Sequence, residues 1–198
     1  MIKYIFIVLI LVLNISTYSQ LNISEYFPNE KGSKWDYLYN ENSIAYIQVT
    51  DNKSDTSYFY YDSKLTPKSY SKFETSVYYL KGDSILLLAK GTYLFDDNID
   101  FWENPTLFLK SNIEKGNVYI TENEFRKYNF ELVDIYPTLE ILGKEFKDII
   151  EIKSVEDDKK ICYRFYAKNV GLIREDEIIE NKRKTILELK KYQLTKKD

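Results

Sequence analysis

The stretch Trp35-Asp36-Tyr37-Leu38-Tyr39-Asn40 (WDYLYN) decides the fold. Its aromatic side chains recur at every second position, so Trp35, Tyr37 and Tyr39 fall on one face of an extended chain. A helix would instead need apolar residues spaced by about 3.6 positions. The stretch therefore predicts a β-strand whose aromatic face is buried.

The same criterion marks fourteen short strands separated by turn residues. They cover residues 35–40, 44–50, 57–61, 73–80, 84–89, 92–95, 106–110, 117–121, 128–136, 138–142, 146–155, 160–168, 171–177 and 184–192. Tight turns are expected at 81–84, 114–117, 143–144 and 156–159. The predicted fold is all-β with minor α content: a single curved antiparallel sheet that forms a half-barrel or a flattened open barrel.

Two segments lack the strand pattern. Residues 22–26 favour one helical turn, which Pro28 would end. Residues 122–127 fit either a second helical turn or a loop. The segments between predicted strands are too short for crossover helices, which argues against a parallel βαβ sheet.

Composition excludes several kinds of chemistry. The 198 residues include no histidine, so the chain cannot build a Ser-His-Asp triad, a Cys-His pair or a zinc site with histidine ligands. It also lacks a G-x-S-x-G elbow, a Walker loop and a dinucleotide-binding glycine motif, and no cofactor is predicted. The net charge of −3 argues against binding to nucleic acid.

The first 19 residues are typical of a signal peptide. A basic start at Lys3 is followed by ten apolar residues, 4–13, and then by polar residues. Because a spanning helix needs about 18 or more apolar residues, a retained anchor is the weaker interpretation. We expect cleavage before Gln20, a single β domain over residues 20–198 without a membrane span, and a periplasmic or extracellular location.

The single cysteine, Cys162, cannot form an internal disulfide. It lies in the apolar run 161–166, where a buried, inert thiol is expected rather than a reactive or intermolecular one.

Two stretches, residues 26–37 and 143–152 with 163–173, resemble a family. They contain FPNEKGSKWDY, which matches the pattern F-P-x-x-x-G-x-x-W-x-Y, and FYAKNVGLI, which resembles Y-Y-A-x-x-V-G-L-V but has Phe165 in place of the first Tyr and Ile173 in place of the last Val. On these motifs the chain resembles exported β-rich proteins and lipoproteins of Bacteroidetes-type bacteria that share a domain of unknown function. The resemblance implies a curved antiparallel sheet and no established reaction. This chain departs from the lipoprotein members because it has no anchor cysteine at the end of its signal segment.

The loop 96–104 is the most acidic candidate site. Asp96, Asp97, Asp100 and Glu103 could supply oxygen ligands to a cation, although the spacing does not match an EF-hand. Trp102 beside these carboxylates would also suit a sugar-binding platform of a glycosidase. A plain solvated loop explains the same residues.

The chain has more tyrosines than an interior can bury with all their hydroxyls paired. We expect some to line a binding face, and the candidates are Tyr58, Tyr60, Tyr61, Tyr78, Tyr79, Tyr163 and Tyr166. Cross-strand packing is the structural alternative. The predicted function is a non-enzymatic exported binding protein for a protein, glycan or lipophilic ligand. A carrier of a lipophilic ligand, which needs a concavity with few charges, and a carbohydrate-active or cation-dependent enzyme remain alternatives.

Overall fold

The computed structural model describes residues 21–40, 43–53, 56–64, 72–91, 101–123 and 125–196. Within these ranges the chain forms twelve strands and one short 3-10 helix, η1. The elements are η1 (Ile23–Tyr26), β1 (Lys34–Tyr39), β2 (Ser43–Lys53), β3 (Thr56–Lys64), β4 (Lys72–Lys81), β5 (Ser84–Gly91), β6 (Thr106–Lys110), β7 (Val118–Glu122), β8 (Lys127–Ile141), β9 (Lys144–Glu156), β10 (Lys160–Ala167), β11 (Gly171–Ile179) and β12 (Lys182–Gln193). The described residues contain no apolar helix of membrane-spanning length.

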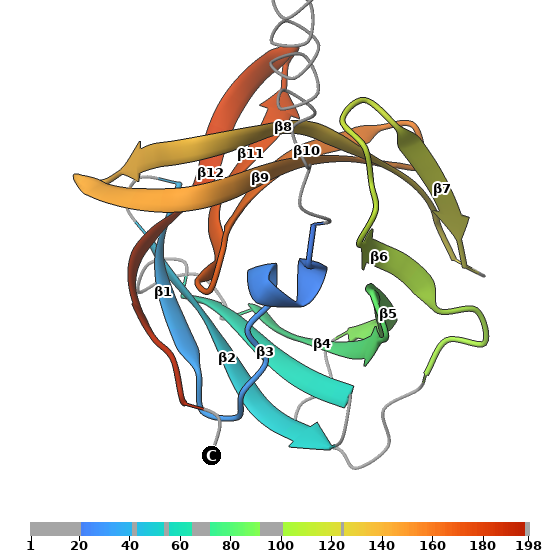
Figure 1. The fold of residues 1–198 in the computed structure, drawn as a ribbon, viewed down its shortest axis with the longest axis horizontal. Coiled ribbons are helices and arrows are strands. Elements are labelled where there is room, and N and C mark those ends of the chain that lie inside the picture. Colours follow the sequence, from blue (N-terminus) through green and yellow to red (C-terminus); the bar gives the residue numbers. More distant parts are fainter. Residues whose placement is uncertain are drawn as a thin grey trace, which may run out of the picture.

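All twelve strands belong to one antiparallel sheet. Their order is β6-β5-β4-β3-β2-β1-β12-β11-β10-β9-β8-β7, so two up-and-down halves, β1–β6 and β7–β12, are joined where β1 pairs with β12. The sheet curves around a central space, and its two edges, β6 and β7, lie on the same side of the molecule (Figure 1). The predicted all-β fold with an open, curved antiparallel sheet is confirmed.

The gap between β6 and β7 has no backbone ladder, and side chains bridge it instead. Three hydrogen bonds cross it: the Leu107 amide donates to Thr121 Oγ1 (3.0 Å), Asn123 Nδ2 donates to Thr106 Oγ1 (2.8 Å), and the Tyr119 hydroxyl donates to the Phe108 carbonyl (2.9 Å). The barrel is therefore held together at this gap without being closed by strand pairing.

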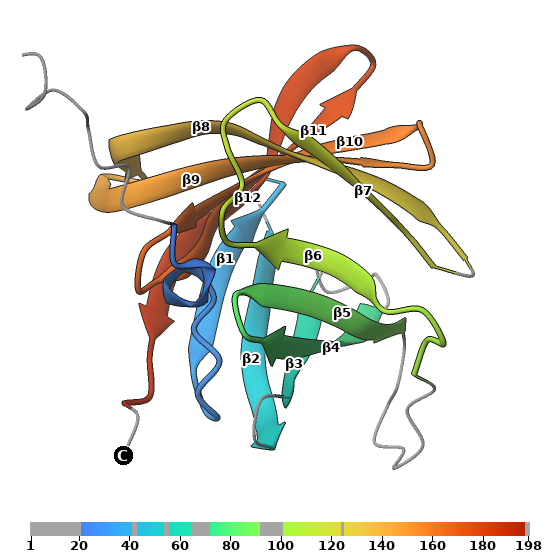
Figure 2. The same cartoon turned by 45° about the vertical axis from the view of Figure 1, so that its right-hand side comes forward.

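The interior is filled at one end by η1, which the strands surround (Figures 1 and 2). Ile23 and Tyr26 are buried and pack among apolar residues of both halves, including Ile85 and Leu109 of the first and Phe130 of the second. The turn predicted at 22–26 is therefore present, and it joins the two halves of the core.

The strand prediction needs one correction. Segments 128–136 and 138–142 are a single strand, β8, which continues through Pro137. β7 pairs with β8 no further than Glu131, so Pro137 lies on a free edge where its missing N–H is not required. In the segment 122–127, Glu122 ends β7 and Lys127 begins β8, and between them Asn123 Oδ1 accepts the amides of Phe125 and Arg126. The described residues of this segment therefore form a connection between two strands and no helix. The strand predicted at 92–95 lies outside the described residues.

Candidate functional site

The two stretches that carry the family resemblance meet inside the barrel. The Trp35 indole Nε1 donates to the Val170 carbonyl at 2.6 Å, and the Tyr37 hydroxyl donates to the Leu172 carbonyl at 2.9 Å. Both aromatic rings are buried. A stretch near residue 30 is thereby fixed to a turn 135 residues later in the chain.

The backbone conformation and the close neighbours of Gly171 require a glycine at this position. Its φ of +94° lies in a region that side chains rarely adopt, and a Cβ there would approach Pro28 Cδ to 3.3 Å and Trp35 Nε1 to 3.6 Å. Gly32 has a φ of +89° just before β1. These motif residues therefore have structural reasons for their identity.

Beside this junction the curved sheet encloses a cavity of about 380 Å³. Part of its lining is aromatic. The Tyr78 ring packs edge to face on Phe27 and on Phe108, with centroids 4.9 and 5.2 Å away, and Phe108 packs in the same way on Phe130 at 5.9 Å. Edge-to-face pairs of this kind hold rings in fixed orientations, so this part of the lining is a preformed apolar surface.

Charged residues also line the cavity. Alternate residues of β10 point into it, from Lys160 through Cys162 and Arg164 to Tyr166. Neighbouring strands and β5 add further polar residues to the lining: Lys90, Ser154, Glu156, Glu175 and Glu177. The cavity is therefore lined by both aromatic rings and charged groups.

Arg164 is the central polar group. Its Nε donates to Glu175 Oε2 at 2.6 Å and its NH1 donates to Ser154 Oγ at 2.9 Å. The Arg164 and Glu175 side chains retain 23% and 20% exposure, and both line the cavity. Burial by itself lowers the pKa of Arg164, but the charge and hydrogen bond of Glu175 outweigh it, and the net pKa lies above the ordinary arginine value. The guanidinium therefore stays cationic and fixed in position.

Lys90 reaches the same cavity from the end of β5. Although the residue is exposed, its pKa is lowered to about 8, first by loss of water around the amine and then by the positive charge of Arg164. Lys160 and Arg126 lower the pKa further, and Glu175 raises it.

The tyrosines of the cavity remain neutral near pH 7. Burial raises the pKa of Tyr78 to about 12, and it also raises the pKa of Tyr128 and of Tyr166. Cys162 is buried in β10, as expected, and burial raises the pKa of its thiol. These groups offer hydroxyl and thiol hydrogen bonds but no negative charge.

The seven tyrosines predicted as a binding face do not share one face. Tyr78 and Tyr166 line the cavity, whereas Tyr79 and Tyr163 do not. Adjacent residues of a strand point to opposite sides, so Tyr78 and Tyr79 could not both face inward. The side chains of the remaining three, Tyr58, Tyr60 and Tyr61 in β3, lie outside the described residues.

The acidic loop falls largely outside the described residues, which do not include Asp96, Asp97 or Asp100. Glu103 is described and is exposed. Among the described residues no cluster of three or more His, Cys, Asp or Glu could hold a metal ion. The predicted cation site therefore stays a prediction.

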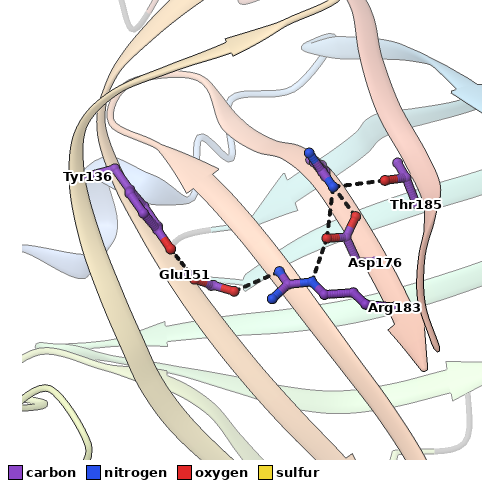
Figure 3. Close-up of polar contacts among 6 residues, drawn as sticks. Tyr136, Glu151, Asp176, Arg183 and Thr185 are labelled. Atoms are coloured by element: carbon purple, nitrogen blue, oxygen red, sulfur yellow. Dashed lines mark hydrogen bonds and ion pairs between the residues drawn. The ribbon is translucent and has the colours of Figure 1, made fainter. Parts of the chain in front are cut away.

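A second polar cluster crosses β8, β9, β11 and β12 away from the cavity lining (Figure 3). Glu151, 2% exposed, accepts the Tyr136 hydroxyl at 2.5 Å and Arg183 NH2 at 2.7 Å. Arg183 Nε also donates to Asp176 Oδ2 at 2.8 Å, and Arg174 Nε donates to Asp176 Oδ1 at 2.7 Å.

This cluster connects four strands and stabilises the sheet. Asp176 is fully buried, and although burial raises its pKa, hydrogen bonds from Arg174 and Arg183 outweigh that effect and the net pKa lies below the ordinary value. The Arg183 guanidinium also lies 3.9 Å above the centroid of the Tyr163 ring. Because an arginine is bonded to each acid, neither acid is placed to give or take a proton from a substrate.

Arg164, Glu175 and Lys90 are not among the site residues predicted from the sequence. Period-two alternation could have found Arg164, because it shares a strand face with Tyr166, two residues later. Glu175 lies directly opposite Arg164 in the β10–β11 pair, but a regular register counted back from the turn would place Arg174 there, because the pairing shifts between Phe165 and Tyr166. Nothing in the sequence indicates that this face is concave, and that is the information that makes these residues a site.

Comparison with known proteins gives one structural likeness. No family model matches the chain, and no curated protein matches it. Among solved structures, a protein described as a "putative lipoprotein" from Parabacteroides distasonis ATCC 8503 is similar to it, with 16% sequence identity and a TM-score of 0.47. The similarity covers 85% of this chain and 98% of that protein.

Proposed function

We propose that this is an exported, non-enzymatic binding protein that holds a small molecule in the cavity of its curved sheet. The cavity carries the proposal: its volume of about 380 Å³ is that of a small-molecule site, and it combines preformed aromatic surface with a few fixed polar groups. The apolar segment 4–13 supports export. The contact between the two motif stretches supports membership of the exported β-rich family named above.

The charges favour this function over a carrier of a purely lipophilic ligand. Such a carrier needs a concavity with few charges, because each charged group that the ligand covers loses its contact with water. Six charged residues line this cavity: Lys90, Glu156, Lys160, Arg164, Glu175 and Glu177.

The same charges give little support to catalysis. Each acid in the lining has a cationic partner: Glu175 pairs with Arg164, Glu177 with Lys160 and Glu156 with Arg126. A general acid or base would instead need a carboxyl group within reach of substrate and free to exchange its proton.

The test uses two tryptophan variants of β4. Ser76 lines the cavity and Tyr79 does not, so Ser76→Trp fills the cavity and Tyr79→Trp is the matched control. Each protein is purified from its own host and examined by native mass spectrometry, with small molecules then released and identified. We expect a bound small molecule on the wild type and on Tyr79→Trp, and its loss from Ser76→Trp at an unchanged circular dichroism spectrum. Equal retention by both variants would contradict a cavity site.

A further inference from the structure

Resting on the proposed function, the lining points to a ligand class: we propose that the cavity binds an uncharged glycan, whose chain continues over exposed rings at one end of the barrel. These rings belong to Phe101, Trp102 and Phe125, and we call them the aromatic rim. The cavity lining places rings beside hydrogen-bonding groups, and the rim lies next to that lining.

Rings and hydrogen-bonding groups are neighbours in the cavity lining. Across the β8–β9 ladder Tyr128 lies opposite Glu156 and Phe130 lies opposite Ser154, and all four residues line the cavity. A sugar ring carries apolar C–H faces and polar hydroxyl groups within one ring, so it needs both kinds of surface side by side. An acyl chain would instead place its methylene groups against the polar partners and desolvate them.

The charges of the lining balance, which favours a ligand without net charge. The three acids are matched by three cations: Glu156, Glu175 and Glu177 against Lys90, Lys160 and Arg164. Each of the acids is already in an ion pair, so a charged ligand would compete with pairs that are made. Hydroxyl groups can bond to paired charges without separating them, because a carboxylate accepts and a guanidinium donates several hydrogen bonds.

Arg164 shows how such a pair can serve a hydroxyl ligand. Glu175 and Ser154 accept hydrogen bonds from its Nε and NH1, which fixes the guanidinium in place. The side chain lines the cavity and keeps 23% of its surface exposed. A guanidinium has more N–H donors than these two bonds use, and the others can bond to ligand hydroxyls.

The aromatic rim is built from two connections that lie on the same side of the molecule (Figures 1 and 2). Phe125, between β7 and β8, is 68% exposed, and Phe101, in the segment before β6, is 52% exposed. The centroids of the Trp102 and Phe125 rings are 6.4 Å apart. Exposed apolar side chains that cluster in this way mark an interaction site, and a flat ring can pack on the C–H face of a sugar.

Hydrogen bonds connect the rim to the cavity lining. The Trp102 amide donates to the Leu88 carbonyl at 2.9 Å, beside the end of β5 that reaches the cavity. Asn123 accepts the Phe125 amide and donates to Thr106, which lines the cavity. η1 packs near the opposite ends of β5 and β6. A chain that leaves the cavity at the end away from η1 therefore meets the exposed rings.

A glycan array tests the ligand class. The labelled protein is applied to an array of neutral and acidic oligosaccharides, and its affinity for the glycan that binds most strongly is measured by isothermal titration calorimetry. We expect that glycan to be uncharged. Binding to no glycan, or a preference for acidic glycans, would overturn the proposal.

Rim variants locate the glycan chain. Phe125→Ala and Trp102→Ala each remove one ring, and each should weaken the glycan about fivefold, as the loss of one aromatic contact implies. Tyr192→Ala removes an exposed ring of β12 outside the rim, so it is the control and should change the affinity less than about twofold. Wild-type affinity in both rim variants, at unchanged circular dichroism spectra, would contradict the rim.

A cavity variant locates the hydroxyl contacts. Arg164→Met/Glu175→Met removes both members of an ion pair, so neither charge is left without its partner. It should weaken the glycan at least about tenfold, because the ligand hydroxyls lose charge-assisted hydrogen bonds. A wild-type affinity would show that this pair does not bind the glycan and would overturn the proposed contacts.

The measurements also separate this proposal from the proposed function. If native mass spectrometry of the wild type finds a lipid or another molecule that is not a sugar, and Ser76→Trp loses that molecule, the cavity is a binding site and the glycan class is wrong. If Ser76→Trp keeps the wild-type affinity for the glycan, the cavity is not the binding site and both proposals fail.

Discussion

Replacing Arg183 by glutamine should destabilise the fold more than any ordinary surface change. Arg183 is bonded to two buried acids, Glu151 and Asp176, whose exposed fractions are 2% and 0%. Removing one partner of a buried pair typically costs ~3–5 kcal/mol. Here Tyr136 and Arg174 keep their bonds to the acids, and the Arg183 side chain is 38% exposed, so solvent screens part of the interaction. We expect a loss of ~2–3 kcal/mol in the free energy of unfolding.

Urea unfolding at pH 7, followed by tryptophan fluorescence, measures this loss. Lys184→Gln is the control, because Lys184 pairs with the exposed Glu180. This variant should lower the free energy of unfolding by less than ~0.5 kcal/mol. The double variant Glu151→Gln/Arg183→Gln removes one acid together with the arginine and should recover at least half of the loss. A decrease of less than ~1 kcal/mol in the free energy of unfolding of Arg183→Gln would refute the interpretation that this cluster stabilises the sheet.

The pH dependence has a defined sign. Because folding lowers the pKa of Asp176, its contribution is fully present above the unfolded value of about 3.9 and is lost as the pH falls through the lower, folded value. The difference in stability between the wild type and Arg183→Gln should therefore narrow below about pH 4. A difference that stays constant down to pH 3 would show that Asp176 does not take part.

Two further outcomes are expected. Gly171→Ala should lower the free energy of unfolding in urea by ~2–3 kcal/mol, because the backbone is strained and the new Cβ contacts Pro28. Gly143→Ala, where a Cβ meets nothing within 4 Å, should lower it by only ~1 kcal/mol through strain alone. Equal losses would contradict close packing around Gly171. Cys162 should react with a maleimide only after unfolding, as measured by mass spectrometry, and rapid labelling of the folded protein would contradict its burial.

Alternation along the chain is enough to predict the sheet, because aromatic and β-branched side chains at every second position have no stable alternative. The turn before Ser84 and the turn at Gly143 follow from residues that tolerate positive φ, and both are present. Pro137 separates two predicted strands, 128–136 and 138–142, but in the structure it lies inside β8. Its position is tolerated because the neighbouring strand stops early, and that depends on pairing rather than on local sequence.

The site was predictable only in part. Tyr78 and Tyr166 are in the cavity, but alternation does not say which face of a curved sheet is concave. Register irregularities also place one extra residue in β5, opposite Val77 and Tyr78, and one in β11, opposite Phe165 and Tyr166, and each changes the phase of the alternation within that strand. Charged residues such as Arg164 look solvent-facing in the sequence, because their burial depends on partners from other strands.

The pairing of β1 with β12 has a kinetic consequence. These two strands lie near opposite ends of the chain, and their ladder joins Lys34 to Gln193, whereas every other ladder joins strands consecutive in sequence. Hairpins within each half can form early, but the β1–β12 ladder cannot form until the final strand has been synthesised, and contacts so distant in sequence form slowly. A chain that cannot complete its barrel before its last strand emerges stays longer in an unfolded form that can be threaded through a narrow translocation channel.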